Sequence, residues 1–215
     1  KDQTYFLYAM NKNVLEKTLF PLENLEKVEV KSIASDMNLG LENRKESMGI
    51  CFIGKRKFSS FVDKYIKPID GPIVDYESNK KISHHTGLSK YTIGQRKGIN
   101  IGGMKNSNES AWYVIDKDIS TNTLIVSQDQ SPLFYTGEIK LENVNIINKQ
   151  FSNNNLKARF RHGGSLKDCI INEDKNTIIL NQEERGIAQG QAAVLYSGTE
   201  CIGGGTVISK CLRKN

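Results

Sequence analysis

The sequence predicts an α+β protein in which a small helical and mixed central domain is followed by an antiparallel β-barrel. Three observations predict this class: a helical apolar period in the first third, a change to strand-like alternation near Gly71, and a later run of short strands without an intervening helix. A sandwich would fit the same strand pattern. We expect domain limits at residues 1–16, 17–103 and 104–215.

Three short helices are expected in the first third. Residues 11–20 predict a helix that is capped by an Asn and stopped at Pro21. Residues 26–39 place apolar side chains at i, i+3, i+4 and i+7, and Gly40 can cap the end of that helix. A third apolar face runs over residues 58–66 and ends at Lys67–Pro68.

Strands are expected from Gly71 onward. Residues 73–76 and 81–84 predict a hairpin, residues 91–93 predict a strand that runs into a basic turn, and residues 100–110 read as a linker or long loop. Adjacent residues of a strand point to opposite faces, so His84 and His85 should not act together. Residues 111–119 and 123–128 predict a second hairpin, and further strands are expected at residues 137–147, 156–162, 168–172, 177–181, 192–196 and 201–209.

Composition narrows the class of protein. The chain has 215 residues, 38% of them hydrophobic, a formal net charge of +6 and a pI near 9.0, which favours a polyanionic partner such as nucleic acid. No apolar run approaches the roughly 18 residues of a membrane span, so we expect no membrane partner. The four cysteines are too widely spaced for a disulfide framework or a zinc site, and we expect no metal and a reducing compartment.

The best candidate for chemistry is Cys51, which lies in an apolar run between Gly49 and Gly54. Lys55 and Arg56 follow closely, and neighbouring cations favour the thiolate, the nucleophilic form of cysteine. From composition alone a buried cysteine at the edge of a strand explains the same residues, because free cysteine packs as a small hydrophobe.

The residues from 156 to 162 predict a basic strand. Leu156, Ala158 and Phe160 share one face, while the other face carries three cations, Lys157, Arg159 and Arg161. Such a ridge can follow a phosphate backbone, and a solvated strand face is the alternative. The turn that holds Arg96 and Lys97 lacks the spacing of a nucleotide-binding loop, but its cations could also meet a phosphate.

Six motifs follow one another along the chain: Lys1-Asp2-Gln3-Thr4-Tyr5-Phe6-Leu7, Phe20-Pro21-Leu22, Gly49-Ile50-Cys51-Phe52-Ile53-Gly54, Tyr91-Thr92-Ile93-Gly94-Gln95-Arg96-Lys97-Gly98, Gly190-Gln191 and Cys201-Ile202-Gly203-Gly204-Gly205. Taken together, they resemble the C-terminal portion of the tRNA-specific 2-thiouridylases. Two further stretches, Lys45-Glu46-Ser47-Met48-Gly49 and Arg159-Phe160-Arg161-His162, look most like the mitochondrial branch of that family. The resemblance implies that the natural start lies upstream, in an ATP-pyrophosphatase domain of which residues 1–16 are the remnant. A mitochondrial location is expected, with a bacterial-type cytoplasmic one as the alternative.

The resemblance also implies a reaction. Members of the family replace the C2 oxygen of the wobble uridine of tRNA with sulfur, after ATP has adenylated that oxygen. Cys51 matches the cysteine that carries a persulfide from a sulfur-donor protein. Its terminal sulfur attacks C2 or is released as sulfide, and a cysteine of the upstream domain then forms a disulfide with Cys51. ATP binds in the upstream domain, so the chain alone should be inactive.

The same resemblance assigns RNA contacts. Lys1, Asp2 and Gln3 match a motif that contacts tRNA near the target base, Arg159 and Phe160 match a contacting pair on the barrel, and Gln191 matches a third contact. Possible contacts to the tRNA backbone are Lys55, Arg56, Arg96, Lys97, Lys157 and Arg161. The strand alternation points Phe160 inward, so a bulge or a contact through Arg159 alone is needed to reconcile the two.

Two other functions fit parts of the sequence. A pure RNA-binding barrel with a helical appendage needs only the basic strand at residues 156–162. A cysteine hydrolase would pair Cys51 with His84 or His85, but no order of motifs supports it.

Overall fold

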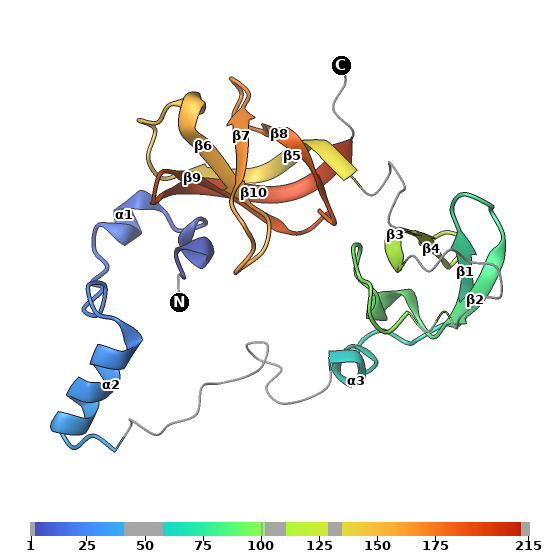
Figure 1. Ribbon diagram of the computed structural model, residues 1–215, viewed down its shortest axis with the longest axis horizontal. Coiled ribbons are helices and arrows are strands. Elements are labelled where there is room, and N and C mark those ends of the chain that lie inside the picture. Colours follow the sequence, from blue (N-terminus) through green and yellow to red (C-terminus); the bar gives the residue numbers. More distant parts are fainter. Residues whose placement is uncertain (1–2, 41–57, 100, 102–110, 129–134, 212–215) are drawn as a thin grey trace.

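The computed structural model describes residues 3–40, 58–99, 101, 111–128 and 135–211, and Figure 1 shows their arrangement. The first elements are a 3-10 helix η1 (Thr4–Leu7), α1 (Lys12–Leu15) and α2 (Lys27–Asp36). The side chain of Asn11 accepts a hydrogen bond from the backbone N–H of Asn13, which confirms the predicted cap, although the helix ends at Leu15. None of the described helices is long and apolar enough to cross a membrane.

Helix α2 begins with a capping box, in which Glu26 and Glu29 satisfy each other's backbone N–H groups. The helix ends earlier than predicted, because Asn38 adopts a left-handed conformation (φ 52°). Its predicted apolar face is exposed, with Ile33 at 43% and Met37 at 64%. Figure 1 shows α2 extending away from the barrel. The third helix, α3 (Phe58–Val62), is also shorter than predicted.

A four-stranded sheet with the order β2-β1-β4-β3 forms the central unit. The hairpin of β1 (Gly71–Asp75) and β2 (Lys81–His85) and the hairpin of β3 (Trp112–Asp118) and β4 (Thr123–Gln128) confirm the two predicted antiparallel pairs. Pairing of β1 with β4 is parallel and was not predicted. The core of the sheet contains Ile73, Tyr91, Ile99, Val114, Leu124 and Val126.

The two histidines of β2 point to opposite faces, as predicted. His84 is exposed, whereas His85 is fully buried. The Nδ1 atom of His85 accepts a hydrogen bond from the Gly87 N–H at 3.1 Å, so its Nε2–H donates to the Asn122 carbonyl at 2.9 Å. Both ring nitrogens of His85 therefore serve the packing of the sheet.

A closed antiparallel barrel follows, with the strand order β10-β5-β8-β7-β6-β9. The strands are β5 (Tyr135–Ile146), β6 (Leu156–Arg159), β7 (Lys167–Ile171), β8 (Thr177–Arg185), β9 (Ala192–Ser197) and β10 (Glu200–Cys211). The fold class predicted from the sequence is thereby confirmed. The predicted barrel began at residue 104, but β3 and β4 pair within the central sheet, and the strands of the barrel begin at Tyr135.

Closure of the barrel removes exposed sheet edges and buries one face of every strand. Its core combines alternate residues of all six strands with residues from the connecting loops. The buried members are Ile139, Leu141, Leu156, Ala158, Phe160, Cys169, Ile171, Ile178, Leu180, Ile187, Ala193, Leu195, Ile202 and Val207.

The N-terminal segment packs on the outer wall of this barrel (Figure 1). Tyr5 of η1 is 7% exposed and clusters with Val194 and Tyr196 of β9. On β5, the Asn145 side-chain amide donates hydrogen bonds to the carbonyls of Tyr8 (2.7 Å) and Met10 (2.9 Å). These contacts join parts of the chain more than 130 residues apart.

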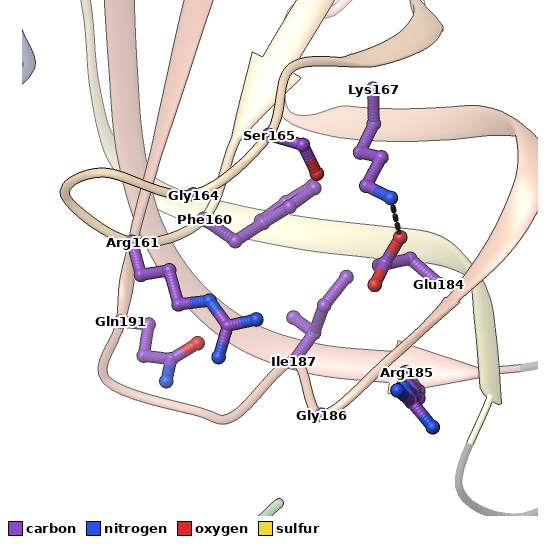
Figure 2. A pocket seen from close by; sticks show the side chains of 10 residues that line it. All are labelled: Phe160, Arg161, Gly164, Ser165, Lys167, Glu184, Arg185, Gly186, Ile187 and Gln191. Carbon is purple, nitrogen blue, oxygen red and sulfur yellow. Dashed lines mark ion pairs between the residues drawn. The ribbon is translucent and has the colours of Figure 1, made fainter.

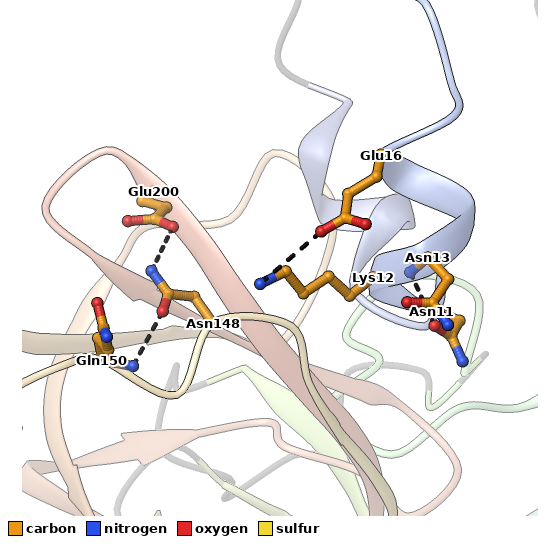
Figure 3. A network of polar contacts seen from close by, with 7 residues as sticks. All are labelled: Asn11, Lys12, Asn13, Glu16, Asn148, Gln150 and Glu200. Carbon is orange, nitrogen blue, oxygen red and sulfur yellow. Dashed lines mark hydrogen bonds and ion pairs between the residues drawn. The ribbon is translucent and has the colours of Figure 1, made fainter.

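Polar side chains of both segments surround this junction. Figure 3 shows Lys12 and Glu16 of the helix facing the barrel loop of Asn148, whose amide donates to the Glu200 carboxylate at 2.8 Å. The N-terminal segment is therefore held by the buried Tyr5 and by backbone-directed hydrogen bonds, with charged groups at the rim.

Candidate nucleic-acid interface

Several of the predicted site residues lie outside the described residues: Lys1, Asp2, Cys51, Lys55 and Arg56. Gln3 is described, is exposed and immediately precedes η1. Because η1 is docked on β9, Gln3 is held near the outer wall of the barrel. The other described site residues lie on β6, on the loop before β9 and on a loop of the central sheet.

Strand β6 has the predicted alternation. Leu156, Ala158 and Phe160 are buried in the barrel core, and Lys157 and Arg159 point outward. Phe160 is only 7% exposed, so its inward orientation agrees with the strand pattern. Phe160 also lines the pocket described below.

Arg159 lies against an aromatic ring on the neighbouring strand. Its guanidinium carbon is 5.1 Å from the centroid of the Tyr196 ring, which faces outward on β9. A cation over an aromatic face is attracted by the quadrupole of the ring. Tyr196 therefore fixes the position of Arg159 on the barrel wall.

Tyr5 completes this layer from the N-terminal side. Its hydroxyl donates to the Ala192 carbonyl at 3.0 Å. Burial, and the neighbouring phenols Tyr8 and Tyr196, raise its pKa to about 12, while Arg159 acts in the opposite direction. The Tyr5 phenol is thus a neutral donor at physiological pH, and it anchors η1 beside Arg159.

The three cations of the predicted ridge have different surroundings. Lys157 forms an ion pair with Asp168 of β7, with Nζ and Oδ1 3.1 Å apart. Arg159 stacks on Tyr196, and Arg161 lies beyond the end of β6 and is exposed. A phosphate would have to compete with a carboxylate for Lys157, so Arg161 is a stronger candidate than Lys157.

A pocket opens at the end of the barrel where β6, β8 and β9 meet their loops (Figure 2). Its lining includes Phe160, Arg161, Arg185 and Gln191. An ion pair between Lys167 and Glu184 closes one side, as the dashed line in Figure 2 shows. The carbonyl oxygen of the Gln191 side chain accepts from the Ala188 N–H at 3.2 Å, which orients that amide. The structure therefore brings together three predicted contacts, Phe160, Arg161 and Gln191.

A loop of the central sheet reaches the same end of the barrel. A Cβ atom added at Gly94 (φ 85°) would lie 3.0 Å from the Cα of Gly186, which lines the pocket. Arg96 and Lys97 of this loop are exposed. The predicted strand over residues 91–93 is wrong: the segment enters a turn in which the Gln95 N–H donates to the Thr92 carbonyl at 2.9 Å, and the Gly94 N–H attaches this turn to β3 through the Val114 carbonyl at 2.8 Å.

Sequence reasoning missed Tyr5, Tyr196, His162 and Arg185. Tyr196 follows from strand alternation, since it points outward on β9 and its neighbour Leu195 points inward. Tyr5 and His162 could not be found in this way, because their contact joins η1 to the loop after β6. Of these residues, Arg185 is exposed and His162 is half-buried, whereas Tyr5 and Tyr196 are buried and support the outer residues from beneath. Cations beside aromatic rings are a combination suited to RNA.

Comparisons with known proteins agree with this arrangement. Residues 1–55 match the family model of a tRNA methyl transferase HUP domain, residues 59–128 that of a tRNA methyl transferase PRC-barrel domain, and residues 128–207 that of an aminomethyltransferase beta-barrel domain. The first two models thus carry tRNA in their descriptions, and the third corresponds to the closed barrel.

Curated relatives match the chain almost from end to end. The tRNA-specific 2-thiouridylase MnmA of Blochmanniella floridana is 43% identical over 219 residues, covering 98% of this chain and 58% of that protein. The proteins of the same name from two other organisms match to a similar extent. That of Blochmanniella pennsylvanica is 42% identical over 215 residues, covering 96% of this chain and 58% of that protein, and that of Aeromonas salmonicida is 37% identical over 214 residues, covering 96% of this chain and 57% of that protein. The chain spans less than two thirds of the length of these relatives, and it belongs to the tRNA-specific 2-thiouridylase family.

Proposed function

We propose that this chain is the C-terminal portion of a tRNA sulfurtransferase that 2-thiolates the wobble uridine, and that it supplies the persulfide cysteine and much of the tRNA-binding surface. Family membership supports the reaction class. One structural observation carries the role of the described residues: η1 docks on β9 beside Arg159, so that Gln3 and the barrel cations lie on a shared surface.

The chemistry requires an activated C2 position. ATP adenylates the C2 oxygen of the uridine and releases pyrophosphate, which turns the oxygen into part of a good leaving group. The terminal sulfur of the Cys51 persulfide attacks C2, and the C–O bond breaks with AMP as the leaving group. A thiolate of the upstream domain then attacks the Cys51 sulfur, and the resulting disulfide leaves the transferred sulfur on the base.

The described residues provide binding in this scheme. Arg159, Arg161 and Arg185 are positioned for phosphate oxygens, while the amides of Gln3 and Gln191 can read base edges or sugar hydroxyls. Arg96 and Lys97 extend the cationic surface toward the central sheet. ATP would be held by the HUP domain. Residues 1–55 of this chain match the family model of that domain.

Two further parts of the proposal concern partners and location. A persulfide on Cys51 needs a sulfur-donor protein, and tRNA must cover the same cysteine in a later state. The chain alone is expected to be inactive. The mitochondrial location stays a prediction, and the relatives named above are bacterial.

The test is the full-length protein with Cys51→Ser. We expect 2-thiouridine formation to be abolished while tRNA affinity stays nearly unchanged, and mass spectrometry after incubation with a persulfide donor to find one added sulfur on Cys51 in the wild type. Cys201→Ser, at a half-buried cysteine, is the matched control and should thiolate normally. Thiolation that survives Cys51→Ser would sink the persulfide role and favour an RNA-binding module without chemistry.

A further inference from the structure

An aromatic pair stands beside the cations of the barrel wall. The rings of Phe6 and His162 are 4.8 Å apart between centroids, with 32° between their planes. Phe6 belongs to η1 and His162 to the loop after β6, so the pair exists only because the N-terminal segment docks on the barrel. We call these two residues the ring pair.

The ring pair is accessible and supported from beneath. Phe6 is 59% exposed and His162 is half-buried. The Tyr5 ring lies edge-on to the Phe6 ring, with 5.4 Å between their centroids, and its centroid is 6.1 Å from that of the His162 ring. Because Tyr5 is buried and bonded to the Ala192 carbonyl, it holds both rings in place. The rings are thus ordered before any ligand arrives, which lowers the entropic cost of binding.

The charges around the ring pair point to the ligand. His162 directly follows Arg161 in the chain, and Tyr5, which contacts both rings, also lies within electrostatic reach of Arg159. Gln3 accepts a hydrogen bond from the Phe6 N–H through its backbone carbonyl at 3.0 Å, so its side chain starts one helical turn away. An exposed aromatic surface flanked by cations and an amide matches the chemistry of an unstacked base on a phosphate backbone.

We propose that the ring pair is a stacking platform for one unpaired base of the bound RNA, with Phe6 and His162 supplying the surface and the neighbouring arginines holding the adjacent phosphates. This inference rests on the proposed function, because it assumes that the substrate is tRNA. It adds a binding role for Phe6 and His162, and it explains why the docked position of η1 would matter for RNA recognition.

The experiment uses the full-length protein and an anticodon stem-loop RNA in which 2-aminopurine replaces one loop base at a time. Stacking on the ring pair should quench the fluorescence at one loop position in the wild type. Phe6→Ala should remove that quenching and weaken binding by about 5- to 160-fold, the range for loss of one base–aromatic stack. The slope of log affinity against log salt should stay unchanged, since no phosphate contact is lost.

Conservative variants and a control separate stacking from folding. Phe6→Trp and His162→Phe keep aromatic surfaces and should keep both affinity and quenching. Tyr76→Ala, at a 49% exposed aromatic residue of the central sheet, should change neither. Wild-type affinity in Phe6→Ala would overturn the proposed stacking platform. If the melting temperature of that variant were lower as well, Phe6 would be covered by protein and not by RNA. Failure of the wild type to bind tRNA would instead overturn the proposed function.

Discussion

The guanidinium of Arg159 on β6 lies 5.1 Å from the centroid of the Tyr196 ring on β9, on the outer wall of the barrel. Arg159 is paired in register with Val194, so Tyr196 lies two residues away along the neighbouring strand, within diagonal reach of a long side chain. The ring limits the freedom of the arginine without neutralising its charge. A cation held in this way can bind a phosphate with less loss of side-chain entropy than a free lysine.

Arg159→Ala should therefore weaken tRNA binding more than Lys157→Ala does. A charge-assisted hydrogen bond contributes about 1.5–3 kcal/mol, so we expect a loss of about tenfold or more for Arg159→Ala and a salt slope smaller by about one. Lys157 already pairs with Asp168 at 3.1 Å, so its removal should cost less. Affinity measured over a series of salt concentrations tests both expectations.

The matched control for that series is Lys140→Ala. Lys140 is an exposed lysine on β5, and in the barrel order β5 lies three strands away from β6 on either side. Its loss removes the same charge from the opposite wall and should leave the affinity nearly unchanged. Equal effects of Lys140→Ala and Arg159→Ala would mean that the net charge, and not this surface, binds tRNA.

The local pattern of the sequence was sufficient for the barrel strands but not for the site. Alternation correctly placed Leu156, Ala158 and Phe160 inside the barrel, because successive side chains of a strand without a bulge point to opposite faces. The docking of Tyr5 on Val194 and Tyr196 depends on contacts across almost the whole chain, which no local pattern encodes. The contact between Phe6 and His162 depends on the same docking, so it could not be predicted from the sequence alone.

The lengths of the helices were also not predictable from the sequence pattern. The expected helix over residues 58–66 has the right apolar spacing, yet α3 ends at Val62, and Tyr65 and Ile66 are 76% and 53% exposed. Short helices are marginal without tertiary packing, so spacing alone does not determine their length. The likewise unpredicted parallel pairing of β1 with β4 depends on a contact between segments about 50 residues apart.

Gly94→Ala tests the contact between the central sheet and the barrel. The added Cβ would lie 3.0 Å from the Cα of Gly186, and the φ of 85° strains any residue with a Cβ. We expect a loss of about 1–3 kcal/mol in the free energy of unfolding, measured with urea, together with weaker tRNA binding. Displacement of the loop moves Arg96 and Lys97 relative to Arg185, which explains the loss of affinity.

Gly198→Ala is the control for strain alone. Gly198 has a similar left-handed φ of 60° in the β9–β10 turn, and an added Cβ there would meet nothing within 4 Å. This variant should lose about 1 kcal/mol of stability and bind tRNA normally. If Gly94→Ala binds tRNA as tightly as Gly198→Ala, the contact with Gly186 does not position the cations.

We expect the free energy of unfolding to fall at alkaline pH because of the buried Cys169 thiol. Cys169 is 2% exposed in the barrel core, and burial, with the nearby Asp168 carboxylate, raises its pKa from 9.0 to about 12. The unfolded chain loses this proton above about pH 9, whereas the folded chain retains it. The unfolded state then binds fewer protons, so the free energy of unfolding falls as pH rises toward 12, by about 1.4 kcal/mol per unit for one group.

Cys169→Ala isolates this contribution. The variant should be less stable than the wild type at pH 8, because the substitution leaves a small cavity, but its stability should fall less steeply between pH 9 and 10. Urea unfolding at steps of pH measures the two slopes, and Cys201→Ala, at a half-buried thiol, is the control. Equal slopes in Cys169→Ala and the wild type would contradict the raised pKa.

A thiol kept protonated in this way is a poor nucleophile. The same measurement therefore tests one reason for sulfur to be loaded on Cys51 and not on Cys169.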